Sequence, residues 1–192
     1  MVCATKVDVG FLLDSSGSIK YHYKDEKKFL KKVVRSFDIS ADGSHAGVVT
    51  FSLAAELSIK LNEFTDFKHF KKAVDAIPLM GRTTRIDRAL RLAQRGLFVE
   101  ENGARNSTRK ILFLLTDGTQ TEMVGAEDPA IVARELEASG ITVIVVGMGS
   151  GVNKAELLKM GGDHTYTADT FEQLISNEFV GLLKKKTCEI GK

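Results

Sequence analysis

The chain has 192 residues, 43% of them hydrophobic and 27% charged, a composition that fits one globular domain over 1–192 and excludes disordered, collagen-like and coiled-coil chains. Its 27 basic and 25 acidic residues give a formal net charge of +2, so bulk charge gives no reason to expect a nucleic-acid partner. No apolar run approaches the roughly 18 residues of a membrane span, so direct membrane insertion is not expected either.

The first half of the chain predicts three strands and one helix. The apolar run at 7–14 shows the weak alternation that is typical of a strand buried on both faces. Apolar residues at helical spacing, opposite lysines, predict a helix at 24–37. A second buried strand is expected at 46–52. Residues 55–64 alternate between apolar and polar side chains, which indicates an antiparallel edge strand.

Two helices are expected next, at 65–77 and 84–97, the first capped at Thr65 or Asp66. Buried strands at 110–117 and 141–149 then follow.

A helix at 128–140 separates those two strands, with Pro129 in its first turn and Gly140 at its end. The chain closes with a short helix near 153–160, a brief strand at 164–168 and a final helix at 171–186. This alternation predicts an α/β fold with a doubly wound, mostly parallel sheet flanked by helices. In such folds ligands bind beyond the carboxyl ends of the strands, where the strand order reverses.

Hydroxyl and carboxyl side chains gather at the expected strand ends. They follow the first strand, precede the helix at 84–97 and follow the strand at 110–117, at Asp14, Ser16, Ser18, Thr83, Thr84 and Asp117. If the first and third of these segments are neighbours, Asp14 and Asp117 emerge side by side and either share a proton or hold a cation. Hard oxygen ligands suit Mg²⁺, Mn²⁺ or Ca²⁺, whereas no His or Cys cluster offers the ligands that zinc prefers.

The Asp-x-Ser-x-Ser pattern at 14–18, the threonine in GRTTRIDRAL and the aspartate in FLLTDG resemble the metal-ion-dependent adhesion site of the von Willebrand factor type A family, which includes integrin inserted domains. The resemblance covers nearly the whole chain and implies a Rossmann-like fold. It implies one divalent cation, Mg²⁺ ahead of Mn²⁺ and Ca²⁺, with a metal-ligand set of Asp14, Ser16, Ser18, Thr84 and Asp117. Counting back from Ala89 and Leu90 favours Thr84 over Thr83. The family often has two glycines before this threonine, but here Arg82 follows Gly81.

The resemblance also implies a function. The domain is expected to be an adhesion or matrix-binding module, secreted or extracellular in a membrane protein, and a fragment of a larger chain. Its metal would accept an Asp or Glu carboxylate from a matrix or cell-surface protein. In the family, ligand binding can be coupled to movement of the last helix, here Phe171 to Lys186. The alternative within the fold is an intracellular scaffold domain.

Enzyme activity is not expected. A phosphoryl-transfer aspartate at this strand end, as in haloacid-dehalogenase-like hydrolases, is usually followed two residues on by a second acid, where this chain has Ser16. No GxxxxGK[ST] phosphate loop is present. The four histidines are scattered and indicate no Ser-His-Asp set, although such sets are assembled in space.

The only two cysteines, Cys3 and Cys188, bracket the chain. They are expected to form a disulfide, which would close a very long loop and agree with an oxidising compartment, and free thiols in the chain ends are the alternative. Asn106 opens the tripeptide Asn-Ser-Thr, an N-glycosylation acceptor in an expected loop.

Arginines recur along the helix at 84–97, opposite its apolar stripe. A solvated helix face explains them most simply. The alternative is an anion-binding surface for a sulfated polysaccharide or an acidic or mineral-associated matrix protein, formed by Arg85, Arg88, Arg91 and Arg95.

Overall fold

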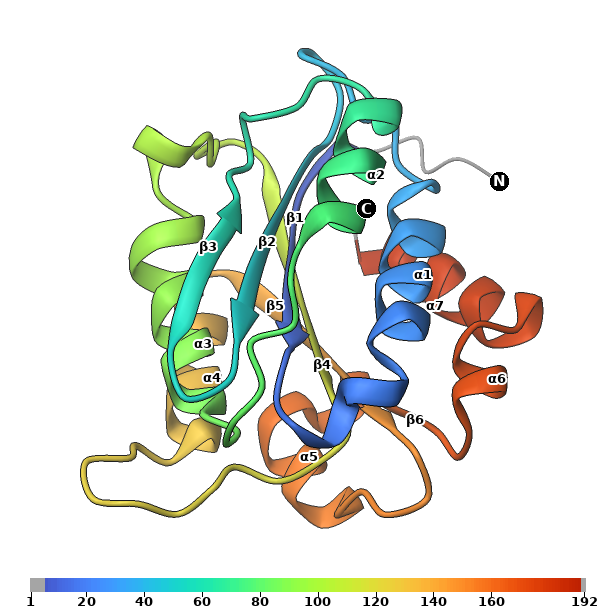
Figure 1. The fold of residues 1–192 in the computed structure, drawn as a ribbon. Helices are drawn as coiled ribbons and strands as arrows, with labels where there is room; N and C mark the ends of the chain where they lie inside the picture. Colours follow the sequence, from blue (N-terminus) through green and yellow to red (C-terminus); the bar gives the residue numbers. More distant parts are fainter. Residues whose placement is uncertain (1–5, 191–192) are drawn as a thin grey trace.

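A computed structural model describes residues 6–190. They form a six-stranded sheet with the strand order β3-β2-β1-β4-β5-β6, in which only β3 is antiparallel to its neighbour (Figure 1). The predicted fold class is therefore confirmed. The strands are β1 (Val7–Asp14), β2 (His45–Phe51), β3 (Ala55–Ile59), β4 (Arg109–Thr116), β5 (Ile141–Met148) and β6 (Thr165–Ala168).

Helices cover both faces of the sheet (Figure 1). Strand side chains alternate between two cores: Phe11 and Leu13 of β1 belong to one, and Leu12 belongs to the other. The first core is covered by α1 (Tyr23–Val34), α2 (Phe67–Ala76), α6 (Phe171–Leu174) and α7 (Asn177–Ile190). The second core is covered by α3 (Ile86–Leu92), α4 (Pro129–Ala138) and α5 (Lys154–Gly161). Both faces of β1 and β4 are thus buried, as their unbroken apolar sequences predict.

The switch in strand order lies between β1 and β4. The chain leaves β1 to build β2 and β3 on one side, then returns to place β4 on the other. β1 and β4 are parallel and in register, with Leu13 opposite Leu115. Their carboxyl ends therefore meet at one edge of the sheet, where doubly wound folds bind ligands.

Leu97 packs closely over two glycines of the sheet. Gly10 and Gly47 are opposite each other in β1 and β2, and a Cβ on either would lie 2.6 or 2.5 Å from a Leu97 methyl. Leu97 ends a π-helical segment, Ala93–Leu97, which continues α3. The helix predicted at 84–97 is therefore α-helical only as far as Leu92.

Two other predicted elements differ from the structure. The strand expected at 55–64 ends at Ile59, because the chain turns there and the Glu63 carboxylate accepts a hydrogen bond from the Lys60 N–H. The final helix expected at 171–186 is two helices. The Ser176 hydroxyl accepts from the Phe179 N–H at 3.1 Å and so starts α7 anew after α6 ends.

Several local signals act as predicted. Asp66, rather than Thr65, caps α2 by accepting from the His69 N–H. Asp128 caps α4 ahead of Pro129, and Gly140 takes a positive φ of 85° just after that helix. Within residues 6–190, no helix combines the length and the apolar character that crossing a membrane requires.

Candidate metal centre

Asp14 ends β1 and is completely buried. Its Oδ1 accepts a hydrogen bond from the Ser16 N–H at 2.9 Å, and its Oδ2 accepts one from the Thr116 hydroxyl at 2.9 Å. Thr116 is the last residue of β4, so the Asp14 carboxylate is held by the ends of two neighbouring strands. The in-register pairing of β1 and β4 thus positions the Asp14 carboxylate in the buried part of the site.

Hydrogen bonds connect the first loop, residues 14–18 at the end of β1, to the third loop, residues 117–128 after β4. Ser16 Oγ lies 3.1 Å from Ser18 Oγ, and the Ser18 hydroxyl donates to Asp117 Oδ1 at 3.0 Å. Ser16 is buried and Ser18 is exposed, so the network runs from the sheet edge to solvent. Four of the five predicted ligands are therefore brought together by direct contacts: Asp14, Ser16, Ser18 and Asp117.

The second loop, which spans residues 78–85, is tied to the first loop through Ser15. The Ser15 hydroxyl accepts from the Met80 N–H at 2.6 Å, and its carbonyl accepts from the Gly81 N–H at 2.8 Å. Arg82 has a φ of 73°, the only positive φ of a non-glycine residue within 6–190. This left-handed conformation is unfavourable for a side chain. Arg82 therefore carries strain at the position where the family often has glycine.

Thr84, the predicted ligand from this loop, is buried, whereas Thr83 is exposed. The Thr84 backbone bonds to Thr121 of the third loop, since its carbonyl accepts from the Thr121 N–H at 2.8 Å. In the described contacts the Thr84 side chain does not bond to the other four residues. The structure thus places Thr84 in the loop that borders the network, and its burial favours it over Thr83.

Burial and mutual repulsion dominate the electrostatics of the site. The pKa of Asp14 is raised to about 6, first by burial and then by the nearby charge of Asp117, although hydrogen bonds from Ser16 and Thr116 oppose the rise. Burial also raises the pKa of Asp117. In the described part of the chain, neither carboxylate has an ion pair with Lys or Arg. Two close carboxylates without a basic partner need a cation or a proton.

The donors present fit a divalent cation. They are carboxylate and hydroxyl oxygens, which are the ligands of Mg²⁺, Mn²⁺ and Ca²⁺. Within residues 6–190 no group of three or more His, Cys, Asp or Glu side chains is placed to hold a metal. A metal at this edge would therefore depend on hydroxyls as much as on carboxylates.

Glu26 is a buried carboxyl beneath the site that the sequence patterns did not indicate. It lies on α1 with no exposed surface, and its Oε1 accepts from the Asp14 N–H at 2.8 Å. Its Oε2 has no hydrogen-bond partner among the described residues. Burial, followed by the charge of Asp14, raises the Glu26 pKa well above its ordinary value. Glu26 thus fixes the backbone of a predicted ligand without facing the ligand surface.

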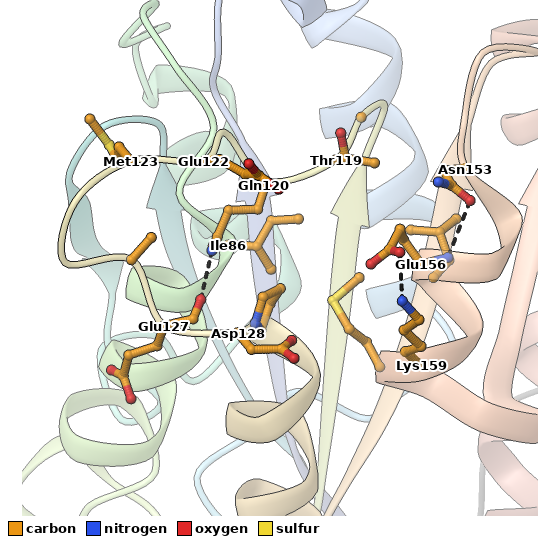
Figure 2. A pocket seen from close by; sticks show the side chains of 15 residues that line it. Ile86, Thr119, Gln120, Glu122, Met123, Glu127, Asp128, Asn153, Glu156 and Lys159 are labelled. Atoms are coloured by element: carbon orange, nitrogen blue, oxygen red, sulfur yellow. Dashed lines mark hydrogen bonds and ion pairs between the residues drawn. The ribbon is translucent and has the colours of Figure 1, made fainter.

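A cleft of about 700 Å³ opens next to Asp117, at the carboxyl ends of β4 and β5. Figure 2 shows Thr119, Gln120 and Met123 of the third loop above it, with Glu156 and Lys159 of α5 on the opposite wall. Glu156 and Lys159 pair with each other at 2.7 Å. The cleft is lined by charged, polar and apolar side chains.

The four arginines of the helix predicted at 84–97 do not form one free cationic face. Arg85 is buried and forms a two-bond ion pair with Asp87, so it does not lie opposite the apolar stripe as predicted. Arg91 pairs with Glu127 and Glu135. Arg88 is exposed and donates to the Leu53 carbonyl, and Arg95 borders the same surface. Anion binding by this helix stays a prediction, and its geometry favours internal ion pairing.

Other predicted residues lie away from the site. Asn106 is exposed in a turn and donates to Glu100, so its position suits a glycan, and glycosylation stays a prediction. Cys188 lies in α7, while Cys3 falls outside the described residues. The pairing of the two cysteines also stays a prediction.

A family model for the von Willebrand factor type A domain matches residues 8–179. This chain belongs to that family. Collagen alpha-6(VI) chain of Mus musculus is 34% identical to this type A domain over 171 residues, which are 88% of the chain and 7% of the relative. Cuticlin-6 of Caenorhabditis elegans is 30% identical over 172 residues, 88% of the chain and 28% of the relative. The type A domain therefore spans only a small part of these relatives.

Solved structures share the fold. Proximal thread matrix protein 1 of the mussel byssus has a TM-score of 0.89 and 30% identity, over 97% of this type A domain and 49% of that chain. Another structure of that protein, with a TM-score of 0.88, is described as having a zinc-occupied metal-ion-dependent adhesion site. Manganese-loaded TRAP of Plasmodium vivax, at 22% identity and a TM-score of 0.72, shows the fold alone, over 93% of this domain and 75% of that chain.

Proposed function

We propose that this domain is an extracellular matrix-binding module that holds one divalent cation, Mg²⁺, and uses it to bind a carboxylate of a protein partner. One observation carries the proposal: the Asp14 and Asp117 carboxylates and the Ser16 and Ser18 hydroxyls form one connected network at the strand switch point, and among the described residues no Lys or Arg is paired to either acid. The matrix collagens among the relatives support the setting.

Asp14, Ser16, Ser18, Thr84 and Asp117 would hold the cation. The bound cation would supply an electrophilic position for an Asp or Glu side chain from another molecule. The chain's own residues keep the donors in place. Thr116 holds one Asp14 oxygen and the Ser16 N–H holds the other, so little reorganisation is needed when the ion binds.

The ionic part of the proposal is tested by calorimetric titration with Mg²⁺, Mn²⁺, Ca²⁺ and Zn²⁺. Asp117→Ala should abolish detectable Mg²⁺ binding, because one of two carboxylates is lost. Asp163→Ala removes an exposed carboxylate from the 3-10 turn Gly162–His164, away from the network, and should leave affinity unchanged. Equal Mg²⁺ affinity in the native chain and Asp117→Ala would sink the metal site.

The adhesive part is tested by binding to immobilised matrix proteins, collagens included, in Mg²⁺ or in chelator. Binding that depends on Mg²⁺ and disappears in Asp117→Ala supports the proposal. Binding that is insensitive to both contradicts it.

We assign ligand selection to the cleft beside Asp117. Met123 borders it and is 41% exposed, so its side chain is available to a partner. Met123→Ala should weaken binding of the matrix ligand severalfold and leave Mg²⁺ affinity unchanged. Ligand affinity that does not move would place selection elsewhere.

A further inference from the structure

A basic groove lies between α1 and α7, away from the metal network. It has a volume of about 400 Å³ and is lined by Lys32 and Arg35 from the α1 side and by Asn177, Val180, Gly181 and Lys184 from α7. The four α7 residues recur at helical spacing and so share one face of that helix. Figure 1 shows α7 running beside α1, and the rings of Phe29 and Phe179 pack between the two helices with centroids 6.2 Å apart.

Three cations meet in this groove without carboxylates to neutralise them. Lys32 Nζ donates to the Ile175 carbonyl at 2.5 Å and to the Asn177 amide oxygen at 3.3 Å, so it is held at the groove by neutral acceptors. Within residues 6–190, no ion pair involves Lys32, Arg35 or Lys184. Burial lowers the pKa of Lys184, and Arg35 and Lys32 lower it further.

The basic surface extends along α1 beyond the groove. Lys24 and Lys28 are exposed and follow the same side of the helix as Lys32 and Arg35. From Lys24 to Arg35 the row covers twelve residues, or about 16 Å at the helical rise. The whole chain has a formal net charge of only +2, so the cations are concentrated on this surface rather than spread evenly over the molecule.

We infer that the groove between α1 and α7, together with the α1 row, binds a sulfated polysaccharide independently of the metal. Lys and Arg supply several N–H donors for sulfate oxygens, and a linear polyanion can follow a row that a single anion cannot fill. Among the described residues that line the groove none is aromatic, which disfavours the base stacking that single-stranded nucleic acid uses. The matrix relatives agree with a polyanion found in that setting.

Gly181 gives a direct test, because it lies in the middle of α7 and lines the groove. A Cβ there would meet nothing within 4 Å, so a side chain can be added without a clash. Gly181→Glu keeps every cation and places a carboxylate in the groove. Gly181→Ala is the matched control, since it changes the backbone preference in the same direction without adding charge.

The probe is a heparin octasaccharide, with binding measured in chelator by calorimetry. Gly181→Glu and the double variant Arg35→Glu/Lys184→Glu should each weaken binding about tenfold or more, a change that corresponds to about 1.4 kcal/mol. Gly181→Ala should bind like the native chain. Lys68→Glu/Lys72→Glu, an equal reversal on exposed residues of α2 outside the groove and the α1 row, should change affinity less than about threefold, because salt screens charges that the polyanion does not contact.

Further measurements distinguish binding at the groove from binding at the metal site. The octasaccharide also has carboxylates, so desulfated heparin should fail to bind the native chain in chelator, and added salt should weaken binding of the sulfated form. The inference is overturned if Gly181→Glu binds normally, if the α2 control loses as much affinity, or if binding requires Mg²⁺. It is also overturned if phosphatidylserine vesicles, rather than the octasaccharide, respond to the groove variants.

Discussion

The side chain of Glu26 holds the backbone of Asp14 in place: Glu26 Oε1 accepts a hydrogen bond from the Asp14 N–H at 2.8 Å, and both residues are fully buried. Burial, followed by the charge of Asp14, raises the pKa of Glu26 well above its ordinary value. A helix residue without contact to solvent thereby fixes the strand end from which the metal network starts.

Substitutions at Glu26 should separate its hydrogen bond from its charge. Glu26→Gln keeps an oxygen acceptor and should retain Mg²⁺ affinity within about twofold, because the hydrogen bond that fixes the Asp14 N–H is preserved. Glu26→Leu removes the acceptor and leaves the buried Asp14 N–H without a partner, which costs about 1 to 3 kcal/mol. Urea unfolding and Mg²⁺ titration of both variants provide the comparison. If Glu26→Leu matches Glu26→Gln in both, the bond has no positioning role.

The stability of the metal-free domain should fall as pH rises through the Asp14 titration. The pKa of Asp14 is about 6 in the fold, mainly because of burial, against its ordinary value of 3.8, so the folded state binds the proton more tightly than the unfolded state. The proton therefore stabilises the fold below about pH 4, and this stabilisation is lost between about pH 4 and 6. This difference in the Asp14 pKa between the folded and unfolded states corresponds to about 3 kcal/mol in the free energy of unfolding.

Asp14→Asn is the control for this titration. In chelator its unfolding free energy should lack the Asp14 contribution to the fall between pH 4 and 6, so at neutral pH it should exceed that of the native chain. Added Mg²⁺ should stabilise the native chain and not the variant. A native chain and Asp14→Asn with parallel pH profiles in chelator would contradict the assignment.

The buried ion pair between Arg85 and Asp87 should stabilise the second loop next to Thr84. Two hydrogen bonds join the side chains, at 2.8 and 2.6 Å, and Asp87 also accepts from the Glu127 N–H at 3.1 Å. Arg85→Leu leaves Asp87 buried without its cation, which costs about 3 to 5 kcal/mol.

Arg88→Ala is the matched control for that prediction. Arg88 is an exposed arginine one turn away whose only described bond is to the Leu53 carbonyl, so its loss should cost less than about 1 kcal/mol. The measurement is urea unfolding of both variants. Equal losses would show that the pair with Asp87 adds nothing beyond an ordinary surface contact.

Sequence patterns predicted most of this fold because its strands are buried on both faces. Runs such as 7–14 and 110–117 are typical of parallel strands that helices cover on both faces. The two strands are neighbours in the sheet, which places Asp14 beside Asp117. The break between α6 and α7 was missed because apolar residues continue at helical spacing across it. The Ser176 hydroxyl that caps α7 was visible in the sequence, but a lone serine inside a helical pattern is a weak signal.

The site was predicted less completely than the fold. A spacing pattern can identify Asp14, Ser16 and Ser18, because they come from one short loop. It does not reveal Glu26, since only the packing of α1 against β1 brings that carboxyl to Asp14. For the same reason, the spacing pattern does not show that Arg85 forms an ion pair with Asp87. Asp87 is only two residues away in sequence and could equally face solvent.

Alanine at two glycines should have opposite effects on stability. Gly181 lies inside α7 with open space around the added methyl, so Gly181→Ala should raise the unfolding free energy by about 0.5 to 1 kcal/mol through helix propensity. A Cβ at Gly47 of β2 would approach a Leu97 methyl at 2.5 Å and the Ile59 carbonyl oxygen at 2.9 Å. Leu97 can adjust its rotamer, but the carbonyl belongs to the paired backbone of β3, so the strand itself must shift.

Overpacking of this kind costs about 1 to 3 kcal/mol. Gly47→Ala should therefore lower the midpoint of urea unfolding while Gly181→Ala raises it, with the same chemical change at both positions. If both substitutions move the midpoint in the same direction, close packing of Leu97 on the β1 and β2 glycines does not limit the sheet. The α7 result also bears on the groove, because a stable Gly181→Ala variant makes any loss of heparin binding in Gly181→Glu attributable to the added carboxylate.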